Sequence, residues 1–145
     1  ERVFETGPLA PPLAASMAIP GLVHPVEIDG RVLVDGAAVN PLPFDLVRGR
    51  AEVIVAVDAS LGAAEPGGAP SPLEALWATI QVMGHALVVE KLKQGSPDLL
   101  LRPKVGGFRL LDFAAVSAIL RVGDSIKDEV KTRVRELVGR SSVCN

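Results

Sequence analysis

The stretch EVIVAVD, residues 52–58, decides the fold class. Its β-branched residues form a continuous apolar run without polar alternation, which is typical of a strand covered on both faces. We therefore predict a central strand over Glu52–Asp58. A second short apolar run, DLLLRP at Asp98–Pro103, predicts another strand.

A long helix is predicted between these strands, over residues 71–95. Ser71 provides an N-cap, Pro72 suits the first helical position and Glu74 completes a capping box. The apolar stripe that follows consists of Leu73, Leu76, Ile80, Met83 and Leu87. Gly95 can end the helix. Strand, helix and strand form a βαβ unit with parallel strands and a right-handed crossover, so the predicted fold class is α/β.

Two further segments accompany this unit. Residues 59–70 are rich in Gly, Ala and Pro and have no period, so they predict a flexible loop. Residues 111–138 predict one long helix, or two helices with a break at Gly123, covering a face of the sheet. The apolar positions at helical spacing are Phe113, Val116, Leu120, Ile126, Val130, Val134 and Leu137.

The first third of the chain predicts a helix, a hairpin and a second, short helix. Pro8–Ser16 has helical composition. Val26–Val34 alternates on either side of Asp29 and Gly30, a dipeptide that suits a two-residue turn with positive φ. Leu42–Val47 predicts the short helix.

The composition is that of one globular domain, or of part of one. The chain has 145 residues, of which 48% are hydrophobic and only 3% aromatic, so the core must be aliphatic. Fifteen basic residues against seventeen acidic ones give a net charge of −2. No run of Lys and Arg is dense enough to attract a phosphate backbone, which argues against nucleic acid as a partner.

The cellular location of the chain is predicted from its cysteine content, its longest uncharged stretch and its first residues. Cys144 is the only cysteine, which excludes an internal disulfide and a cysteine-based metal site. The longest uncharged stretch, Ala75–Val89, is shorter than the roughly 20 residues that span a bilayer. We therefore predict a soluble, cytoplasmic chain. The first residues show neither an initiator Met nor a signal pattern, and they favour a start inside a larger domain.

Standard catalytic and cofactor motifs do not occur in the sequence. Phosphate-binding loops, the dinucleotide fingerprint, H-E-x-x-H and G-x-S-x-G are all absent, so no cofactor and no metal is predicted. The nearest serine motif, Gly-Asp-Ser at residues 123–125, lies inside a helical pattern. His24 and His85 stand alone, and a structural role is favoured over a ligand role for His85 on the long helix.

Three aspartates come under consideration as functional carboxylates. The hairpin turn explains Asp29. Asp58 ends the central strand, where open α/β sheets bind ligands, so it is either a turn or cap residue or a ligand-binding residue. Asp35 follows the hairpin in the sequence LVDGAAVN, and Gly36 with the next two alanines leaves open space beside it. The residues alone leave Asp35 as either a turn residue or a functional carboxylate.

The run from Ala15 to Asp58 resembles the second half of the patatin-like phospholipase domain of bacteria. The matching segments are, in order, Ala-Ser-x-x-Ile-Pro-Gly, Pro-Val, the Asp-Gly-Ala block, Asn-x-Leu-Pro and the strand ending in Val-Asp. TIQVM, SPDLLLRP and LLDF resemble later segments of that family, so the resemblance covers nearly the whole chain. It implies a three-layer, lysophospholipase-like α/β fold with helices on both faces of the sheet. Residues 1–145 would be the C-terminal portion of one such domain, and therefore incomplete.

The resemblance also implies an activity, the hydrolysis of lipid acyl esters by a Ser-Asp dyad without a catalytic histidine. The dyad aspartate would be Asp35, with Gly36, Ala37, Asn40 and Ser16 as supporting motif residues. Asp35 would accept or relay the proton of a serine that attacks the ester, and water would then hydrolyse the acyl-enzyme. The implied partner is a lipid or ester substrate, with transient contact to a membrane surface, and the family requires no cofactor.

Three departures from the family pattern limit what can be carried over. The family's G-x-S-x-G motif and its Gly-rich oxyanion loop lie upstream of this region and are absent from these 145 residues. We expect the upstream half of the same domain to supply them, and the chain alone to be inactive. Ala14 stands where the family often has Arg, and Ala37 replaces the commoner second glycine. The alternative is a non-catalytic, degenerate patatin-like fragment with an interaction or structural role.

Overall fold

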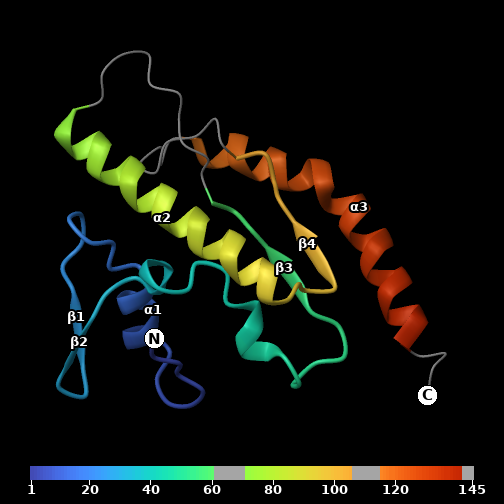
Figure 1. Cartoon of the computed structure of the whole chain (residues 1–145), viewed down its shortest axis with the longest axis horizontal. Coiled ribbons are helices and arrows are strands. Elements are labelled where there is room, and N and C mark those ends of the chain that lie inside the picture. The colour runs from blue at the N-terminus through green and yellow to red at the C-terminus, as the bar shows by residue number, and fades with distance from the viewer. Residues whose placement is uncertain (61–70, 106–114, 142–145) are drawn as a thin grey trace. The chain divides into compact units, whose positions relative to one another are not determined.

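The computed structural model describes residues 1–60, 71–105 and 115–141 (Figure 1). The chain divides into two compact units, Glu1–Pro41 and Leu42–Asn145. Of the loop predicted over residues 59–70, residues 61–70 lie outside the described part. Both units combine helices with short strands, which is compatible with the predicted α/β class.

The first unit contains helix α1 (Ala10–Ser16) and a β-hairpin. Strands β1 (Val26–Ile28) and β2 (Arg31–Leu33) pair in antiparallel fashion (Figure 1). The two turn residues between them, Asp29 and Gly30, have φ angles of 52° and 71°. Positive φ at both positions is the geometry of a type I′ turn, so the hairpin predicted from the Asp-Gly dipeptide is confirmed.

The second unit contains the predicted βαβ arrangement. Strand β3 (Val55–Val57) pairs in parallel with β4 (Leu99–Leu101), and helix α2 (Pro72–Gln94) lies between them in the chain. The capping box at the start of α2 is present, because the Ser71 N–H donates to Glu74 Oε2 at 2.8 Å and the Glu74 N–H donates to Ser71 Oγ at 3.3 Å. The parallel pair and the helix start were therefore predicted correctly.

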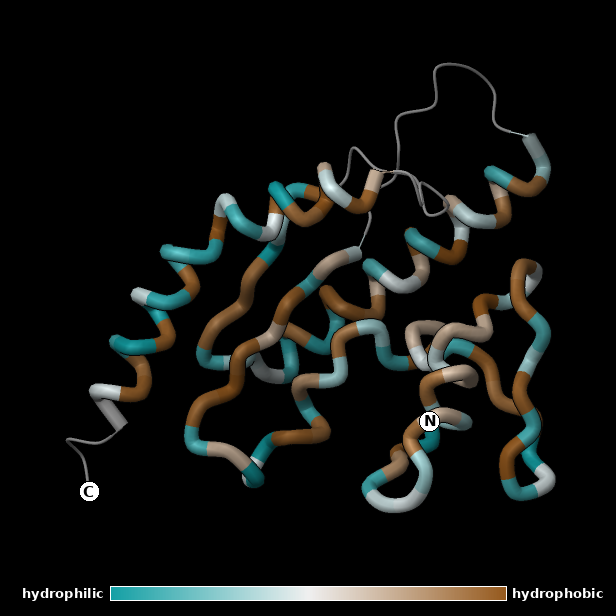
Figure 2. The backbone as a smooth tube through the Cα atoms, turned by 180° about the vertical axis from the view of Figure 1, so that it is seen from behind, coloured by the Kyte–Doolittle hydropathy of each residue, from teal (hydrophilic) through white to brown (hydrophobic). Residues whose placement is uncertain are grey.

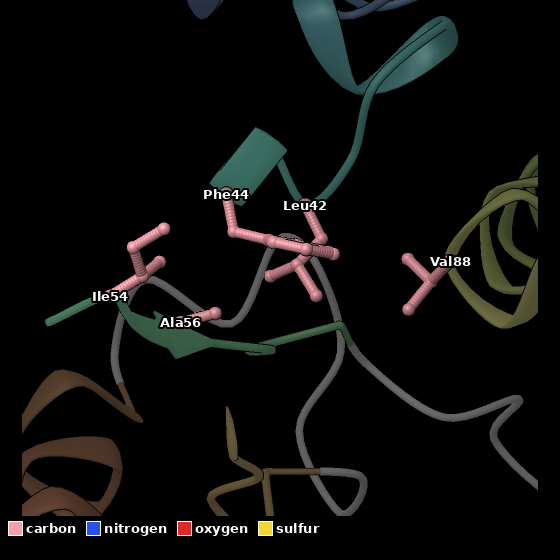
Figure 3. Close-up of a cluster of buried hydrophobic side chains, with 5 residues drawn as sticks. All are labelled: Leu42, Phe44, Ile54, Ala56 and Val88. Atoms are coloured by element: carbon pink, nitrogen blue, oxygen red, sulfur yellow. The ribbon is translucent and has the colours of Figure 1, made fainter. Parts of the chain in front are cut away.

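The core of this unit lies between α2 and one face of the β3–β4 pair. It consists of Leu42, Phe44, Ile54, Ala56 and Val88 (Figure 3). Leu92 and Leu100 are partly buried and pack against it. Phe44 belongs to the short 3-10 helix η2 (Phe44–Val47), which the sequence predicted as a short helix. Only one phenylalanine enters this cluster, so the core is largely aliphatic, as expected from the composition.

The predicted apolar stripe of α2 is largely exposed among the described residues. Val88 is the α2 residue that enters the core, whereas Leu73, Leu76 and Met83 are 53%, 51% and 62% exposed. A helix of 23 residues is about 35 Å long, whereas three-residue strands extend only about 10 Å. The described sheet is too short to cover the stripe, and hydrophobic residues recur along the uncovered length of the helix (Figure 2).

The C-terminal helix α3 (Val116–Ser141) continues through Gly123 without a break. Its stripe is confirmed in the second half, where Ile126, Val130, Val134 and Leu137 are half-buried. In the first half, Val116 and Leu120 are exposed, which corrects the prediction for these two residues. Phe113 lies outside the described residues.

The second face of the β3–β4 pair is only partly covered. Leu99 and Leu101 of β4 are buried, and Leu99 and Leu137 of α3 line one shallow pocket. On β3, however, Val55 and Val57 are 39% and 52% exposed. The prediction of a strand covered on both faces is therefore wrong for β3 within the described residues, because α3 contacts β4 and leaves these valines open. The three-layer sheet stays a prediction, since the described strands form two separate two-stranded sheets.

Candidate functional site

Asp35 lies between β2 and the 3-10 helix η1 (Gly36–Ala38), and its backbone is held on both sides. Its N–H donates to the carbonyl oxygen of Ala18 at 3.0 Å, and Ala18 is completely buried. Its own carbonyl oxygen accepts from the Ala38 N–H at 3.2 Å. Asp35 is half-buried. These two bonds fix the direction in which its side chain leaves the backbone.

The Asp35 carboxylate caps η1. Oδ1 accepts a hydrogen bond from the Ala37 N–H at 2.9 Å, as aspartate does at the start of many helices and turns. Within the described residues no other donor contacts this carboxylate, so Oδ2 is available to a further donor. The geometry thus combines a turn role and an accessible oxygen, the two alternatives that the sequence left open.

Among the described residues, nothing fills the space beside Asp35, as the small residues after it predicted. A Cβ added to Gly36 would meet no heavy atom within 4 Å, and Ala37 is exposed. A second molecule or chain segment can therefore approach the carboxylate from this side without displacing side chains.

Asn40 and Ser16, the other two motif residues, lie in the same unit as Asp35 but differ in their contacts. Asn40 is buried, its backbone N–H donates to the Gly36 carbonyl oxygen at 2.9 Å, and its Nδ2 donates to Glu1 Oε1 at 2.8 Å. Asn40 therefore closes the turn that holds η1. Ser16 is exposed at the C-terminal end of α1, and no hydrogen bond joins it to Asp35 among the described residues.

A separate polar cluster lies at the carboxyl ends of the parallel strands. Asp58 follows β3 and is 8% exposed. Its Oδ1 accepts hydrogen bonds from the hydroxyl and the N–H of Ser60, and its Oδ2 accepts from Arg102 Nε at 3.2 Å. Both carboxylate oxygens of Asp58 are thus engaged by neighbouring residues.

The pKa of Asp58 reflects these partners. Burial raises the pKa, but the hydrogen bonds from Ser60 and the bond and charge of Arg102 outweigh burial and hold it below its usual value of 3.8. The carboxylate is therefore ionised at neutral pH. Its Oδ2 joins the ends of β3 and β4 through Arg102, and its Oδ1 holds the residues that follow β3 through Ser60. This arrangement favours a turn or cap role for Asp58 over a role in ligand binding.

The sequence reasoning did not find Ser60 and Arg102 as partners of Asp58, although a signal for Arg102 was present. In the parallel register Val57 lies opposite Leu101. The residues that follow, Asp58 and Arg102, must then meet at the same edge of the sheet. Extending the predicted parallel pairing by one residue gives this ion pair.

The remaining candidates from the sequence are two histidines and one serine. His24 and His85 are exposed, so the structural histidine expected at position 85 is not buried among apolar neighbours. Ser125 lies within α3 and its hydroxyl donates to the Val122 carbonyl oxygen, as the helical pattern predicted. Across residues 1–60, 71–105 and 115–141, no three His, Cys, Asp or Glu side chains gather as metal ligands would.

The length of α2 corrects the prediction that this part of the chain is too short to span a bilayer. It contains the uncharged stretch considered too short to span a bilayer, but the helix itself has 23 residues and is long and apolar enough to cross one by length and composition. Only 6% of the 18-residue apolar segment within this helix is buried. Length and composition are weak evidence of a span, since core helices and signal sequences meet the same criteria.

Comparison with known proteins shows which family the first part of this sequence resembles. Residues 3–48, which contain the hairpin, Asp35 and η1, match the family model of patatin-like phospholipases. The predicted resemblance to this family is therefore confirmed for the segment that contains the Asp-Gly-Ala block.

Individual relatives extend the similarity. The chain is 45% identical over 67 residues, 46% of its length, to an uncharacterized NTE family protein of Mycobacterium tuberculosis. It is 27% identical to Lysophospholipase NTE1 of Yarrowia lipolytica, with 86% of this chain aligned. It is 29% identical to patatin-like phospholipase domain-containing protein 7 of Rattus norvegicus, with 84% aligned. The last two similarities reach beyond the first unit, because they cover most of the chain.

These relatives are much longer than the region that matches. The aligned parts span 18% of the mycobacterial protein, 10% of the Yarrowia protein and 11% of the rat protein. The chain therefore spans less than a fifth of the length of these curated relatives.

Proposed function

We propose that this chain is the C-terminal portion of a lipid acyl hydrolase domain of the patatin-like type, in which Asp35 acts with a serine from outside these 145 residues. The proposal is supported by the match of residues 3–48 to patatin-like phospholipases and by relatives named lysophospholipase and patatin-like phospholipase domain-containing protein. The substrate would be a lipid ester met at a membrane surface.

The geometry of Asp35 is the observation that supports this role most directly. A carboxylate that takes a proton from a hydroxyl needs a fixed backbone, a defined orientation and one oxygen left for the hydroxyl. The bonds to Ala18 and Ala37 supply the first two, and Oδ2 supplies the third. The open side at Gly36 gives the hydroxyl and the ester a route to that oxygen.

Asp35 alone performs no chemistry on an ester. The nucleophile and the donors that stabilise the oxyanion have to come from the preceding half of the domain, and removing one such donor typically lowers the rate about 10²- to 10³-fold. The isolated chain is therefore expected to be inactive, and the longer polypeptide is expected to hydrolyse esters.

The alternative is a non-catalytic patatin-like fragment. The observation in its favour is the bond from the Ala37 N–H to Oδ1, because capping η1 is by itself a sufficient reason for an aspartate at this position.

Labelling of the longer polypeptide with a fluorophosphonate probe separates the two readings. Its full reading frame is expressed in the wild-type form and with Asp35→Asn, which retains an oxygen that can accept from Ala37 but loses the basicity of the carboxylate. We expect the wild type to label and to hydrolyse a lysophospholipid. We expect Asp35→Asn to lower turnover by about 10²-fold or more.

Asp29→Asn is the matched control. Asp29 belongs to an Asp-Gly pair in the same unit, has a φ of 52° that asparagine adopts readily, and lies in the hairpin turn. It should leave labelling and turnover unchanged. A wild-type protein that fails to label would support the non-catalytic alternative, and unchanged turnover in Asp35→Asn would refute the role given to Asp35.

A further inference from the structure

A hydrogen bond ties the turn at η1 to the first residues of the chain. The Nδ2 of Asn40 donates to Glu1 Oε1 at 2.8 Å, across a separation of 39 residues. A bond from an amide to a carboxylate is charge-assisted and is therefore stronger than a bond between neutral groups. Both residues lie in the unit Glu1–Pro41, so their contact belongs to one compact body.

The side chain of Asn40 depends on its acceptors. Asn40 is 8% exposed, whereas Glu1 is exposed. An amide that is buried without a hydrogen-bond partner costs free energy, so buried asparagines keep their acceptors. The Glu1 carboxylate therefore helps to hold Asn40 in place from the surface of the unit.

The backbone of Asn40 transmits this constraint to a single peptide group. The Asn40 N–H donates to the Gly36 carbonyl oxygen at 2.9 Å. The same peptide group carries the Ala37 N–H, which donates to Asp35 Oδ1 at 2.9 Å. Because a peptide group is planar, its C=O and its N–H rotate together. A displacement of Asn40 therefore rotates the donor that orients the Asp35 carboxylate.

We propose that Glu1 and Asn40 are positioning residues for the Asp35 carboxylate. Glu1 holds the Asn40 side chain, the Asn40 backbone holds the peptide group between Gly36 and Ala37, and that group sets the direction of the carboxylate. Neither Glu1 nor Asn40 takes part in the chemical steps. This role rests on the proposed function, because it concerns the reaction that Asp35 serves.

Two substitutions of Glu1 test the pair in the protein made from the full reading frame. Glu1→Gln keeps an oxygen that accepts from Asn40, whereas Glu1→Ala removes the acceptor. We expect Glu1→Ala to lower kcat for a lysophospholipid about 10-fold or more and to keep KM within about twofold, since a displaced carboxylate slows the reaction and not the binding. Glu1→Gln should keep kcat within about threefold of the wild type. Equal losses in the two variants would overturn the role of the hydrogen bond.

An exchange of donor and acceptor between the two residues is a sharper test. Asn40→Asp places a second carboxylate against Glu1 and should lower kcat at least about 10-fold. Adding Glu1→Gln supplies an amide donor opposite the new carboxylate, so the double variant regains a hydrogen bond in the reverse direction. We expect its kcat to recover to within about threefold of the wild type. A double variant no more active than Asn40→Asp alone would contradict the proposal.

Glu27→Ala is the matched control for the loss of a carboxylate in the first unit. Glu27 lies in β1 and is exposed. Its substitution should leave kcat and KM unchanged. A loss as large as that of Glu1→Ala would show that the charge of the unit matters and the bond to Asn40 does not, which would also overturn the pair.

Amide hydrogen exchange of the longer protein follows the Ala37 N–H without any need for catalysis. This amide should exchange at least about fivefold faster in Glu1→Ala and in Asn40→Asp than in the wild type, and the double variant should restore its protection. The Asp58 amide, which donates to the Leu101 carbonyl oxygen at 2.8 Å in the second unit, is the internal reference and should not change. Unchanged exchange at Ala37 would show that the pair does not hold this peptide group. Equal acceleration at Ala37 and Asp58 would show that the variants only loosen the fold, and either result refutes the positioning role.

The exchange measurement separates the positioning role from the proposed function. If the wild type neither labels with fluorophosphonate nor hydrolyses the ester, the proposed function is refuted, and the Ala37 amide still decides whether Glu1 and Asn40 hold the turn. If the wild type is active and Glu1→Ala and Asn40→Asp keep its kcat, the proposed function stands and the positioning role is refuted.

Discussion

Arg102 donates from Nε to Oδ2 of Asp58 at 3.2 Å, across the carboxyl ends of β4 and β3. The two ends of the pair are unequal, because the Arg102 side chain is 54% exposed and the Asp58 side chain only 7%. Solvent screens the exposed guanidinium, so the energetic weight of the contact lies in the hydrogen bonds to the buried carboxylate. Asp58 is therefore expected to contribute to stability more than a surface ion pair does.

The first prediction concerns Asp58→Asn. The variant keeps the shape of the side chain but loses the charge that Ser60 and Arg102 stabilise, so the free energy of unfolding should fall by about 1–2 kcal/mol at pH 7. Urea unfolding measures this fall in the free energy of unfolding. Because the folded pKa of Asp58 lies below 3.8, its contribution is present above that pH and is lost as the pH falls through the folded value. The difference between wild type and variant should therefore shrink below about pH 4, and a difference independent of pH would contradict this account.

The second prediction compares two valines of one helix. Val88 is 2% exposed and fills the core against Leu42 and Phe44, whereas Val82 is 60% exposed. Val88→Ala should lower the free energy of unfolding by about 2 kcal/mol, because a cavity forms in the cluster. Val82→Ala should change it by less than about 0.5 kcal/mol. Urea unfolding of the 145-residue chain checks both, and equal effects would mean that α2 does not pack through its Val88 side.

The predictions that the sequence supported correctly rest on local signals. Asp29 and Gly30 define the hairpin through their own backbone preferences, and Ser71 with Glu74 defines the start of α2 through two hydrogen bonds within one turn. The parallel pairing of β3 and β4 followed from the order of strand, helix and strand. The first two features depend on a few neighbouring residues and the third on the order of elements along the chain, so a single sequence contains all three.

The predictions that failed depend on surfaces that the described residues do not supply. The stripe of α2 and the face of Val55 and Val57 are apolar in the pattern expected of buried residues, but burial requires a partner of matching length. The prediction of a catalytic role for Asp35 likewise depends on a residue other than Asp35 itself. The sequence and the local geometry identify an oriented carboxylate, whereas the proposed dyad also requires a nucleophilic serine, which we expect from outside these 145 residues.

The third prediction uses two glycines of the first unit. Gly30 has a φ of 71°, whereas Gly36 does not have a positive φ. At either position an added Cβ would meet no heavy atom of the described residues within 4 Å. Gly30→Ala should lower the free energy of unfolding by about 1–2 kcal/mol through backbone strain alone. Gly36→Ala should change it by less than about 0.5 kcal/mol. Thermal unfolding of the two variants checks this, and a harmless Gly30→Ala would exclude the type I′ turn.

The last prediction separates the two roles of Asp35 in stability and in chemistry. Asp35→Ala removes the acceptor for the Ala37 N–H and should lower the free energy of unfolding by about 1 kcal/mol, the usual cost of losing such a cap. Asp35→Asn keeps an oxygen in the same place, so its unfolding should stay within about 0.5 kcal/mol of the wild type. Chemical denaturation of both variants gives these values.

The stabilities of Asp35→Asn and Asp35→Ala decide how a loss of activity in Asp35→Asn is to be interpreted. If Asp35→Asn is as stable as the wild type and yet hydrolyses esters far more slowly in the longer polypeptide, the lost carboxylate is responsible, because the cap at Ala37 is still present. If Asp35→Asn is as unstable as Asp35→Ala, any fall in turnover follows from the loss of η1 geometry, and the carboxylate has only its capping role. The accessible Oδ2 predicts the first result, since this oxygen takes no part in the cap.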